Sequence, residues 1–227
     1  AQSLRHNMPF LVMASPGALL LLVFSYLPMV GIIIAFKDFR ASLGIFDSPW
    51  VGFKNFEFLL RSPVLARITA NTLVLNGLFI LAGLIASVGL ALLLNEVRLK
   101  IAARAYQTVV FFPYFISWVI VGYFSFALLN SDNGLVNRAL QSVGLEPVAW
   151  FSSPQYWPLI LTLAHIWKSV GYGSIIYLAA MLGINPEYYE AAMLDGANKL
   201  QQIRYITLPH LVPVMIILTL LAIGRIF

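Results

Sequence analysis

The sequence predicts an all-α, polytopic membrane protein, and three observations support this fold class. Hydrophobic residues make up 60% of the 227-residue chain, whereas charged residues make up only 10%. The mean hydropathy is +0.86, which is more apolar than a soluble domain of this length can bury. The apolar residues also form long runs without strict alternation, which argues against a membrane β-barrel.

Five apolar runs are the expected membrane helices, and the first four exceed the ~20 residues that a helix needs to cross a bilayer. The fifth run is shorter, contains Arg225 and has no polar tail after it, so we expect the chain to be truncated. Prolines in or near the runs are tolerated when neighbouring groups satisfy the freed carbonyls. The runs cover residues 10–36, 69–94, 105–129, 156–184 and 211–227, and the prolines are Pro16, Pro28, Pro113, Pro158 and Pro213.

A polar segment separates the last two apolar runs and must therefore lie outside the lipid. Asn185 is suited to cap a helix, Pro186 to its first turn, and Glu187 to the positive end of its dipole. Gly196 fits the end of this first short helix. An ordinary surface connection between two membrane helices would carry the same caps.

A second short helix is expected after Gly196. Leu200, Ile203 and Ile206 recur every three residues and would form one apolar stripe. Pro209 is then expected to break the chain before the last apolar run, because proline lacks the N–H that a helix interior requires.

This segment resembles the cytoplasmic loop of permease subunits in binding-protein-dependent ABC importers. The likeness rests on the order Glu-Ala-Ala, Gly and Ile-x-Leu-Pro with the family's spacing. It implies the helical bundle of a type I importer, with one permease domain over residues 1–227, outer loops 37–68 and 130–155, and a cytoplasmic coupling loop 185–209. The residues that it implies for coupling to an ATPase are Glu190, Ala191, Ala192, Asp195, Gly196, Ile206, Leu208 and Pro209.

Two weaker likenesses fall in the outer loops. Family members often carry an aromatic element similar to residues 51–56, which we expect to lie along the outer leaflet as an interfacial anchor. Gripping a binding protein is the alternative role. The stretch 134–140 matches a second family pattern, and the turn signal at residues 131–134 predicts a short helix after it.

Positive residues do not settle the orientation, because both sides carry the same number of them. The resemblance implies a protein of the bacterial inner membrane, with the N-terminus and the coupling loop on its cytoplasmic side. The net charge of +5 then fits a membrane surface, and no basic-aromatic pattern indicates nucleic acid. The inner set is Arg5, Arg98, Lys100, Arg104, Lys199 and Arg204, and the outer set is Lys37, Arg40, Lys54, Arg61, Arg67 and Arg138.

Polar and aromatic residues inside the apolar runs are the candidate transport path. Carbohydrate sites pair aromatic faces with groups that bind hydroxyls, and these residues supply both. Ordinary helix packing by Asn and Gln, with interfacial Tyr and Trp, is the alternative. The candidates are Asn71, Asn76, Trp118, Tyr123, Trp167, Lys168 and Tyr172, with Gln107, Tyr114 and Tyr177 as further members.

Lys168 lies near the middle of an apolar run, where a charge costs ~2.5–3.5 kcal/mol on insertion scales. No acidic residue lies inside the apolar runs. We therefore expect its charge to be compensated by a carboxylate of a partner permease or of an acidic saccharide. Gly171 and Gly173 are expected to make the adjoining helix surface thin and accessible.

Catalysis is not expected in this chain. It has no cysteine, its histidines (His6, His165 and His210) lack metal-ligand spacing, and it has no phosphate-binding loop for ATP. No cofactor or metal is therefore expected here, and ATP and Mg²⁺ would bind on a partner ATPase.

The tract 25–37 most resembles permeases for complex oligosaccharides, including alginate-type importers. The resemblance implies a homologous second permease of different sequence, two ATPase subunits and a periplasmic or extracellular solute-binding protein.

One alternative function is a permease of the same architecture that moves an amino acid, a peptide or a phosphate ester. An ion-coupled secondary transporter would call for paired intramembrane carboxylates or broken helices in an inverted repeat, and a membrane-embedded enzyme would call for a nucleophile–base pair or a metal cluster. Neither set is evident in the sequence.

Overall fold

The computed structural model describes residues 8–97 and 99–227, so the expectations for Arg5, His6 and Arg98 fall outside the described residues. The described chain is helical, apart from connections and one isolated antiparallel bridge between Lys37 and Trp50. It divides into two compact units, residues 1–70 and 71–227, and each is described by itself.

The first unit begins with one long apolar span, Met8–Phe36, of 29 residues. It is built from α2 (Met8–Leu21), a π-helical turn (Leu22–Tyr26) and a 3-10 helix (Leu27–Phe36). At ~1.5–2.0 Å of rise per residue, this span is long enough to cross a bilayer. The first predicted membrane helix is confirmed.

The loop that follows, which the sequence analysis places outside, is folded around a lysine. Lys37 is only 4% exposed, and its ammonium donates hydrogen bonds of 3.0 Å to the Ile45 carbonyl and 2.7 Å to the Phe46 carbonyl. It also lies 4.9 Å from the centre of the Trp50 ring. These contacts close the turn that contains the short helix α3 (Gly44–Asp47).

The aromatic element singled out in the sequence continues this loop. The Asn55 side chain donates to the carbonyls of Ala35 (3.0 Å) and Lys37 (2.9 Å) and so ties α4 (Lys54–Arg61) to the end of the first span. A cluster of three rings, with centroids 5.4–5.8 Å apart, packs beside it. The rings are those of Phe36, Phe53 and Phe56.

Helix α5 (Pro63–Asn95) begins earlier than the sequence predicted. The polar connection was expected to reach residue 68, but the helix already starts at Pro63, which suits a first helical turn because it needs no N–H donor there. From residue 71 onward α5 belongs to the second unit.

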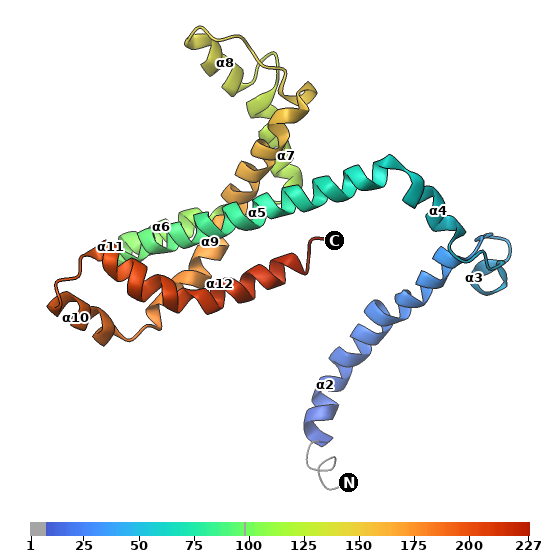
Figure 1. Ribbon diagram of the computed structural model, residues 1–227, viewed down its shortest axis with the longest axis horizontal. Helices are drawn as coiled ribbons and strands as arrows, with labels where there is room; N and C mark the ends of the chain where they lie inside the picture. Colours follow the sequence, from blue (N-terminus) through green and yellow to red (C-terminus); the bar gives the residue numbers. More distant parts are fainter. Residues whose placement is uncertain (1–7, 98) are drawn as a thin grey trace. The chain divides into compact units, whose positions relative to one another are not determined.

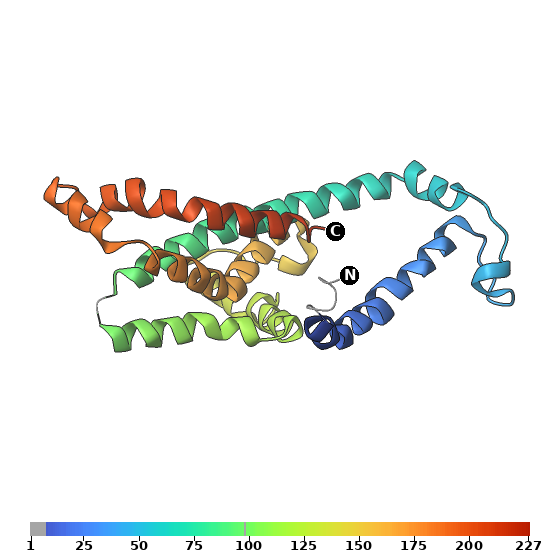
Figure 2. The ribbon, with the colours of Figure 1, turned by 90° about the horizontal axis from the view of Figure 1, so that it is seen from below.

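Three helices form the core of the second unit: α5, α9 (Trp157–Leu182) and α12 (Leu208–Ile223). Figures 1 and 2 both show α12 running alongside the later part of α5. Because α12 ends at Ile223, Arg225 follows the helix rather than lying inside it. The buried apolar residues of this core are Val88, Ala91, Leu94, Tyr177, Leu178, Met181 and Leu211.

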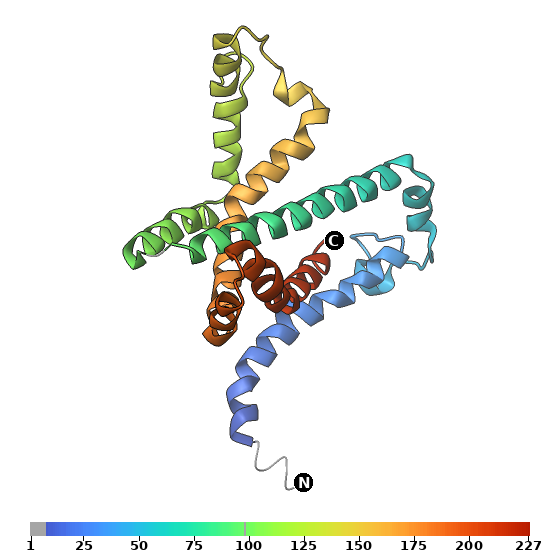
Figure 3. The ribbon, with the colours of Figure 1, turned by 60° about the vertical axis from the view of Figure 1, so that its left-hand side comes forward.

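The apolar run 105–129 is not one straight helix, contrary to the expectation. Helix α6 (Lys100–Phe111) and the 3-10 turn Phe112–Phe115 are bent by 97° against α7 (Trp118–Leu129) (Figure 3). Pro113 cannot donate to the preceding turn, and the Ser117 hydroxyl accepts from the Ile120 N–H to start a new helix. Neighbouring groups were expected from the sequence to accommodate Pro113 within a continuous helix. The helix ends at this proline instead.

The loop 130–155 is organised by Asn137 in α8 (Leu135–Ser142), and the predicted short helix is confirmed. Asn137 is 1% exposed and donates to the carbonyls of Ser131 and Val148. Its side-chain oxygen accepts from the Val148 N–H and the Trp150 indole, so every polar position of the amide is used.

Figure 1 places α8 and α10 (Pro186–Leu194) at opposite ends of α9. The 26 residues of α9 correspond to a helix of ~39 Å, enough to separate two sides of a membrane. The loops 130–155 and 185–209 therefore lie on opposite sides of this unit, as the sequence predicted.

Candidate functional site

The coupling loop begins with the capped helix α10. The Asn185 side-chain oxygen accepts from the Glu187 N–H at 3.1 Å, and Pro186 occupies the first turn. At the other end Gly196 has a φ of +80°, the Gly196 N–H bonds to Met193 and the Ala197 N–H bonds to Ala192. This pair of hydrogen bonds is a Schellman cap, which needs a left-handed residue at the glycine. Both predicted ends of the helix are confirmed.

The motif residues of α10 are presented to the outside of the chain. Glu190, Ala191, Asp195 and Gly196 are exposed, whereas Ala192 is half-buried. Leu194 has 90% of its surface exposed. The end of α10 thus offers a carboxylate, small residues and an apolar side chain that nothing in the described residues covers.

The helix after Gly196 continues further than expected. Helix α11 (Lys199–Gln202) starts with a capping box formed by Asn198 and Gln201, and a π-helical turn (Ile203–Thr207) joins it to α12 without a break. Pro209 was expected to break the chain but lies in the first turn of α12. The widened turn before it admits the proline ring, which would clash in regular α-helical register.

The predicted stripe on this helix is only partly formed. Ile203 and Ile206 are half-buried, whereas Leu200 is 73% exposed. Leu208 is half-buried against the core, and Pro209 is exposed. Ile206 and Leu208, in the second half of the motif, therefore pack α12 against the bundle, whereas the residues of α10, in the first half, are mostly exposed.

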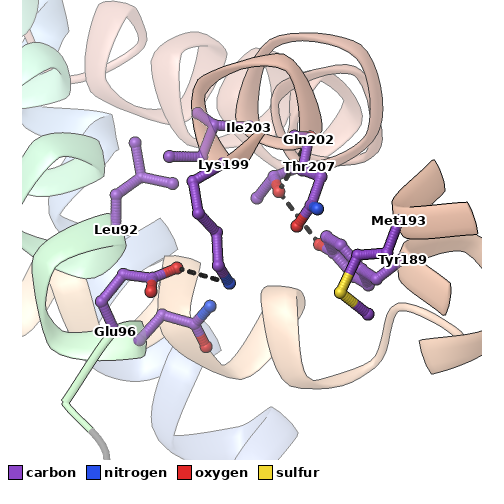
Figure 4. Close-up of a pocket in the computed structure, with 9 residues that line it drawn as sticks. Leu92, Glu96, Tyr189, Met193, Lys199, Gln202, Ile203 and Thr207 are labelled. Carbon is purple, nitrogen blue, oxygen red and sulfur yellow. Dashed lines mark hydrogen bonds and ion pairs between the residues drawn. The ribbon is translucent and has the colours of Figure 1, made fainter. Parts of the chain in front are cut away.

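Polar contacts lie on the inner side of the loop (Figure 4). The Tyr189 hydroxyl is 3.0 Å from the Thr207 hydroxyl, and the Lys199 ammonium is 3.4 Å from a Glu96 carboxylate oxygen at the end of α5. A cavity of about 170 Å³ lies between α5, α10 and α11, with Met193 on its wall. Sequence reasoning missed Tyr189, Thr207 and Glu96, since none of them belongs to the motif.

The bend between α6 and α7 holds the candidate transport residue Lys168. Its ammonium donates to the carbonyls of Tyr114 (2.7 Å) and Ile116 (2.6 Å), both in the bend. It also lies 5.6 Å from the Tyr114 ring and 5.7 Å from the Trp118 ring. The expected carboxylate is therefore not the only source of compensation: backbone dipoles and ring faces of the same chain supply it.

Two stacks of rings flank Lys168. Tyr114 and Tyr172 are stacked with centroids 4.7 Å apart, and Phe111 lies 5.7 Å from Tyr114. In the second stack, the His165 ring lies 4.7 Å from the Phe79 ring and 6.4 Å from the Trp118 ring. The bend, α5 and α9 thus bring aromatic faces from distant parts of the chain to one charge.

The structure gathers some of the predicted path residues and separates others. Lys168, Tyr172, Trp118 and Tyr114 come together, with Phe79, Phe111 and His165 as members that the sequence did not single out. Trp167 instead lines a different groove of about 640 Å³ between α7, α8 and α9. Asn76 bonds to the Thr72 carbonyl of its own helix, Asn71 and Tyr123 are exposed, Gln107 is half-buried, and Tyr177 belongs to the core.

The expectation for the two glycines beside Tyr172 was wrong. Gly171 is buried, and a Cβ atom there would overlap the Val110 carbonyl oxygen of α6. A Cβ atom at Gly173 would meet the Ser87 hydroxyl of α5. These glycines let helices approach closely, so they make a packing surface rather than an accessible one.

Among the described residues no group of His, Cys, Asp and Glu is arranged to hold a metal ion. Within residues 8–97 and 99–227, four helices are long and apolar enough to cross a membrane, and the bent pair makes a fifth candidate. This fold, with a capped polar loop at one end of the core, defines a multi-pass α-helical membrane protein. The chain belongs to the family of binding-protein-dependent transport system inner membrane components, whose model matches residues 79–227.

Similar proteins include carbohydrate transport permeases. The chain is 41% identical over 213 residues to the polygalacturonan/rhamnogalacturonan transport system permease protein YteP of Bacillus subtilis, and 40% identical over 209 residues to protein LplB of the same organism. These matches cover 94% and 92% of the chain but 66% of each relative, so the chain spans about two thirds of their length.

A solved structure also matches. It is the crystal structure of a bacterial ABC transporter involved in the import of the acidic polysaccharide alginate. The match has a TM-score of 0.89 and 38% identity, and it covers 99% of this chain and 75% of the other. A second structure of a bacterial alginate transporter holds a periplasmic protein bound to an alginate pentasaccharide and matches with a TM-score of 0.88.

Proposed function

We propose that the chain is the permease subunit of an ATP-driven, binding-protein-dependent importer of oligosaccharides. The observation that carries this proposal is the capped helix α10, which presents Glu190, Ala191 and Leu194 outward in a chain of the permease family. An exposed short helix with one apolar anchor is suited to lie in the groove of a soluble partner. That partner would be an ATPase subunit in the cytoplasm, which also places the N-terminus inside.

The other partners follow from the proposed role as an importer permease. A homologous second permease would complete the pathway, two ATPase subunits would bind ATP and Mg²⁺, and a solute-binding protein would deliver the substrate from outside. The alginate transporter bound to its periplasmic protein supports the last of these. ATPase closure would move α10, and the bundle would then open alternately to the two sides of the membrane.

The substrate class is an oligosaccharide, and an acidic one fits best. Tyr114, Trp118 and Tyr172 have 42%, 53% and 45% of their surface exposed, so aromatic surface beside the Tyr114–Tyr172 stack is open to sugar rings. An ammonium has three donors, and Lys168 uses two on backbone carbonyls, which leaves one for a ligand carboxylate. The importer of alginate among the similar structures supports this choice. A neutral oligosaccharide would use the same ring faces without the charge.

The test is uptake by the full-length protein reconstituted in liposomes with its copurified partners. Partners are identified by mass spectrometry, and uptake of a labelled alginate pentasaccharide is compared with uptake of a neutral pentasaccharide of glucose. ATP-dependent uptake of the acidic sugar supports the whole proposal. Uptake of the neutral sugar alone corrects the substrate class, and a complex without any ATPase contradicts the coupling role.

A further inference from the structure

The inner side of the coupling loop is unusually polar for a place so well buried. Gln202 is 5% exposed and Thr207 is 3% exposed, and both flank the π-helical turn Ile203–Thr207. Buried polar side chains remain only where they are hydrogen-bonded. No buried side-chain nitrogen or oxygen in the part of the chain that the structure describes lacks a partner.

The hydrogen bonds of these side chains form a path across the loop. The Tyr189 hydroxyl, in the middle of α10, is 3.0 Å from the Thr207 hydroxyl at the base of α12. The Thr207 hydroxyl is in turn 3.5 Å from the backbone carbonyl oxygen of Gln202. The Gln202 amide donates to the Ala197 carbonyl at 3.1 Å, directly after the Gly196 turn. The middle of α10 and the segment after Gly196 are therefore both linked to the buried residues Gln202 and Thr207.

An exposed ion pair between Lys199 and Glu96 also connects the loop to the bundle, and this connection is weaker. Lys199 and Glu96 are 3.4 Å apart, with 68% and 50% of their side-chain surfaces exposed. Exposed ion pairs of this kind contribute little, about 0–1 kcal/mol, and salt screens them. The buried link through Tyr189 and Thr207 is screened much less.

We propose that Tyr189, Thr207 and Gln202 form a polar joint through which movement of α10 is passed to α12. Tyr189 is a positioning residue, since it acts through Thr207 and touches neither ATP nor substrate. The joint lies at the π-helical turn, where α12 departs from regular α-helical hydrogen bonding. Without the joint, α10 would shift against α12 into the adjoining cavity of about 170 Å³ rather than carry α12 with it. This inference rests on the proposed function of the loop.

The first test measures uptake of alginate pentasaccharide per ATP hydrolysed by the complete transporter in liposomes. Tyr189→Phe and Thr207→Val each remove one hydroxyl while keeping the shape of the side chain. We expect each to lower uptake per ATP about three- to tenfold, which is the range that one lost hydrogen bond corresponds to. The double variant should lose no more than Thr207→Val alone, because the Thr207 hydroxyl takes part in both contacts.

Two variants serve as matched controls. Thr207→Ser keeps the hydroxyl and should retain the wild-type ratio. Tyr188→Phe removes the hydroxyl of the neighbouring tyrosine, which is 53% exposed and contacts the His210 ring instead, and should change nothing. A wild-type ratio in Tyr189→Phe overturns the joint, and so does an equal loss in Tyr188→Phe.

The second test needs no substrate. Because the chain has no cysteine, Glu187→Cys in α10 and Ile216→Cys in α12 give it one pair of labelling sites, and the chain is spin-labelled before it is assembled with its partners. In the assembled transporter we expect the label distance to stay constant when ATP binds, and to broaden or shift when Tyr189→Phe is added. The same distance distribution with and without Tyr189→Phe overturns the joint.

The outcomes separate the joint from the proposed function. If the loop does not couple to an ATPase at all, the unsubstituted complex shows no ATP-dependent uptake and the Gly196→Ala change described below has no effect. If the loop couples but not through this joint, the unsubstituted complex transports, Gly196→Ala impairs it, and Tyr189→Phe behaves as wild type.

Discussion

The ammonium of Lys168 in α9 donates a hydrogen bond of 2.7 Å to the carbonyl oxygen of Tyr114, 54 residues earlier in the chain. A second bond of 2.6 Å reaches Ile116 beyond the 3-10 turn. The Lys168 ammonium thus donates to two carbonyls that have no helical N–H donor at the bend. These carbonyls in turn compensate the charge of the ammonium. Neither is stable at membrane depth without the other.

Replacing Lys168 should therefore destabilise the bend. Lys168→Met keeps the length of the side chain but leaves two carbonyls without their donor, at ~1–3 kcal/mol for each unsatisfied group. We expect the thermal midpoint of the purified protein in detergent to fall by several degrees. Lys199→Met, which removes an exposed lysine, should lower it far less. Equal midpoints for Lys168→Met and the unsubstituted protein would show that the two hydrogen bonds do not hold the bend.

Gly171→Ala should separate α9 from α6. The added methyl group would overlap the Val110 carbonyl, which is backbone and has little freedom to move away. We expect a reduced yield of folded protein and an earlier thermal transition, measured by size-exclusion chromatography after heating. Gly122→Ala is the control, because no atom lies within 4 Å of the position that its Cβ would take. Identical profiles for the two variants would contradict the close approach.

Gly196→Ala should uncouple the loop while leaving the bundle folded. At φ +80° an alanine costs ~1–2 kcal/mol more than glycine, so the Schellman cap and the end of α10 would shift. We expect less copurified ATPase or less substrate-stimulated ATP hydrolysis at an unchanged thermal midpoint. Gly183→Ala, at φ −83°, is the control and should behave as wild type. Wild-type hydrolysis and copurification in Gly196→Ala would remove this turn from coupling.

The orientation can be tested with single cysteines, since the chain has none of its own. Asp132 and Lys199 are both exposed and lie in loops at opposite ends of α9. In intact cells a membrane-impermeant thiol reagent should label Asp132→Cys, and it should label Lys199→Cys only after the membrane is opened. Labelling of position 199 alone in intact cells would invert the topology.

Local signals in the sequence predicted local structure well. Asn185, Pro186 and Gly196 act within a few residues of their own position, so capping rules fix both ends of α10 without any tertiary contact. The short helix after Gly134 was predicted in the same way. The prediction that Pro209 breaks the chain was wrong because a π-helical turn accommodates this proline. Capping and periodicity signals in the sequence do not indicate such a turn.

Contacts between distant segments were beyond the sequence. Lys168 was recognised as a charge that needs compensation, but hydrogen bonds to carbonyls of the bend require knowing that the run 105–129 bends. Gly171 was interpreted as open surface because nothing in the sequence places Val110 against it. His165 was set aside for lack of metal-ligand spacing, and its stacking on Phe79 has no signature along the chain.

The bend between α6 and α7 also bears on the energy source of transport. Unwound carbonyls in membrane helices are commonly occupied by sodium ions, and such sites empty and fill with the ionic composition of the medium. Here the positive charge is covalently attached to α9 and cannot diffuse away. The shape of this segment should therefore be indifferent to sodium and potassium gradients, which agrees with the proposed coupling of transport to nucleotide hydrolysis.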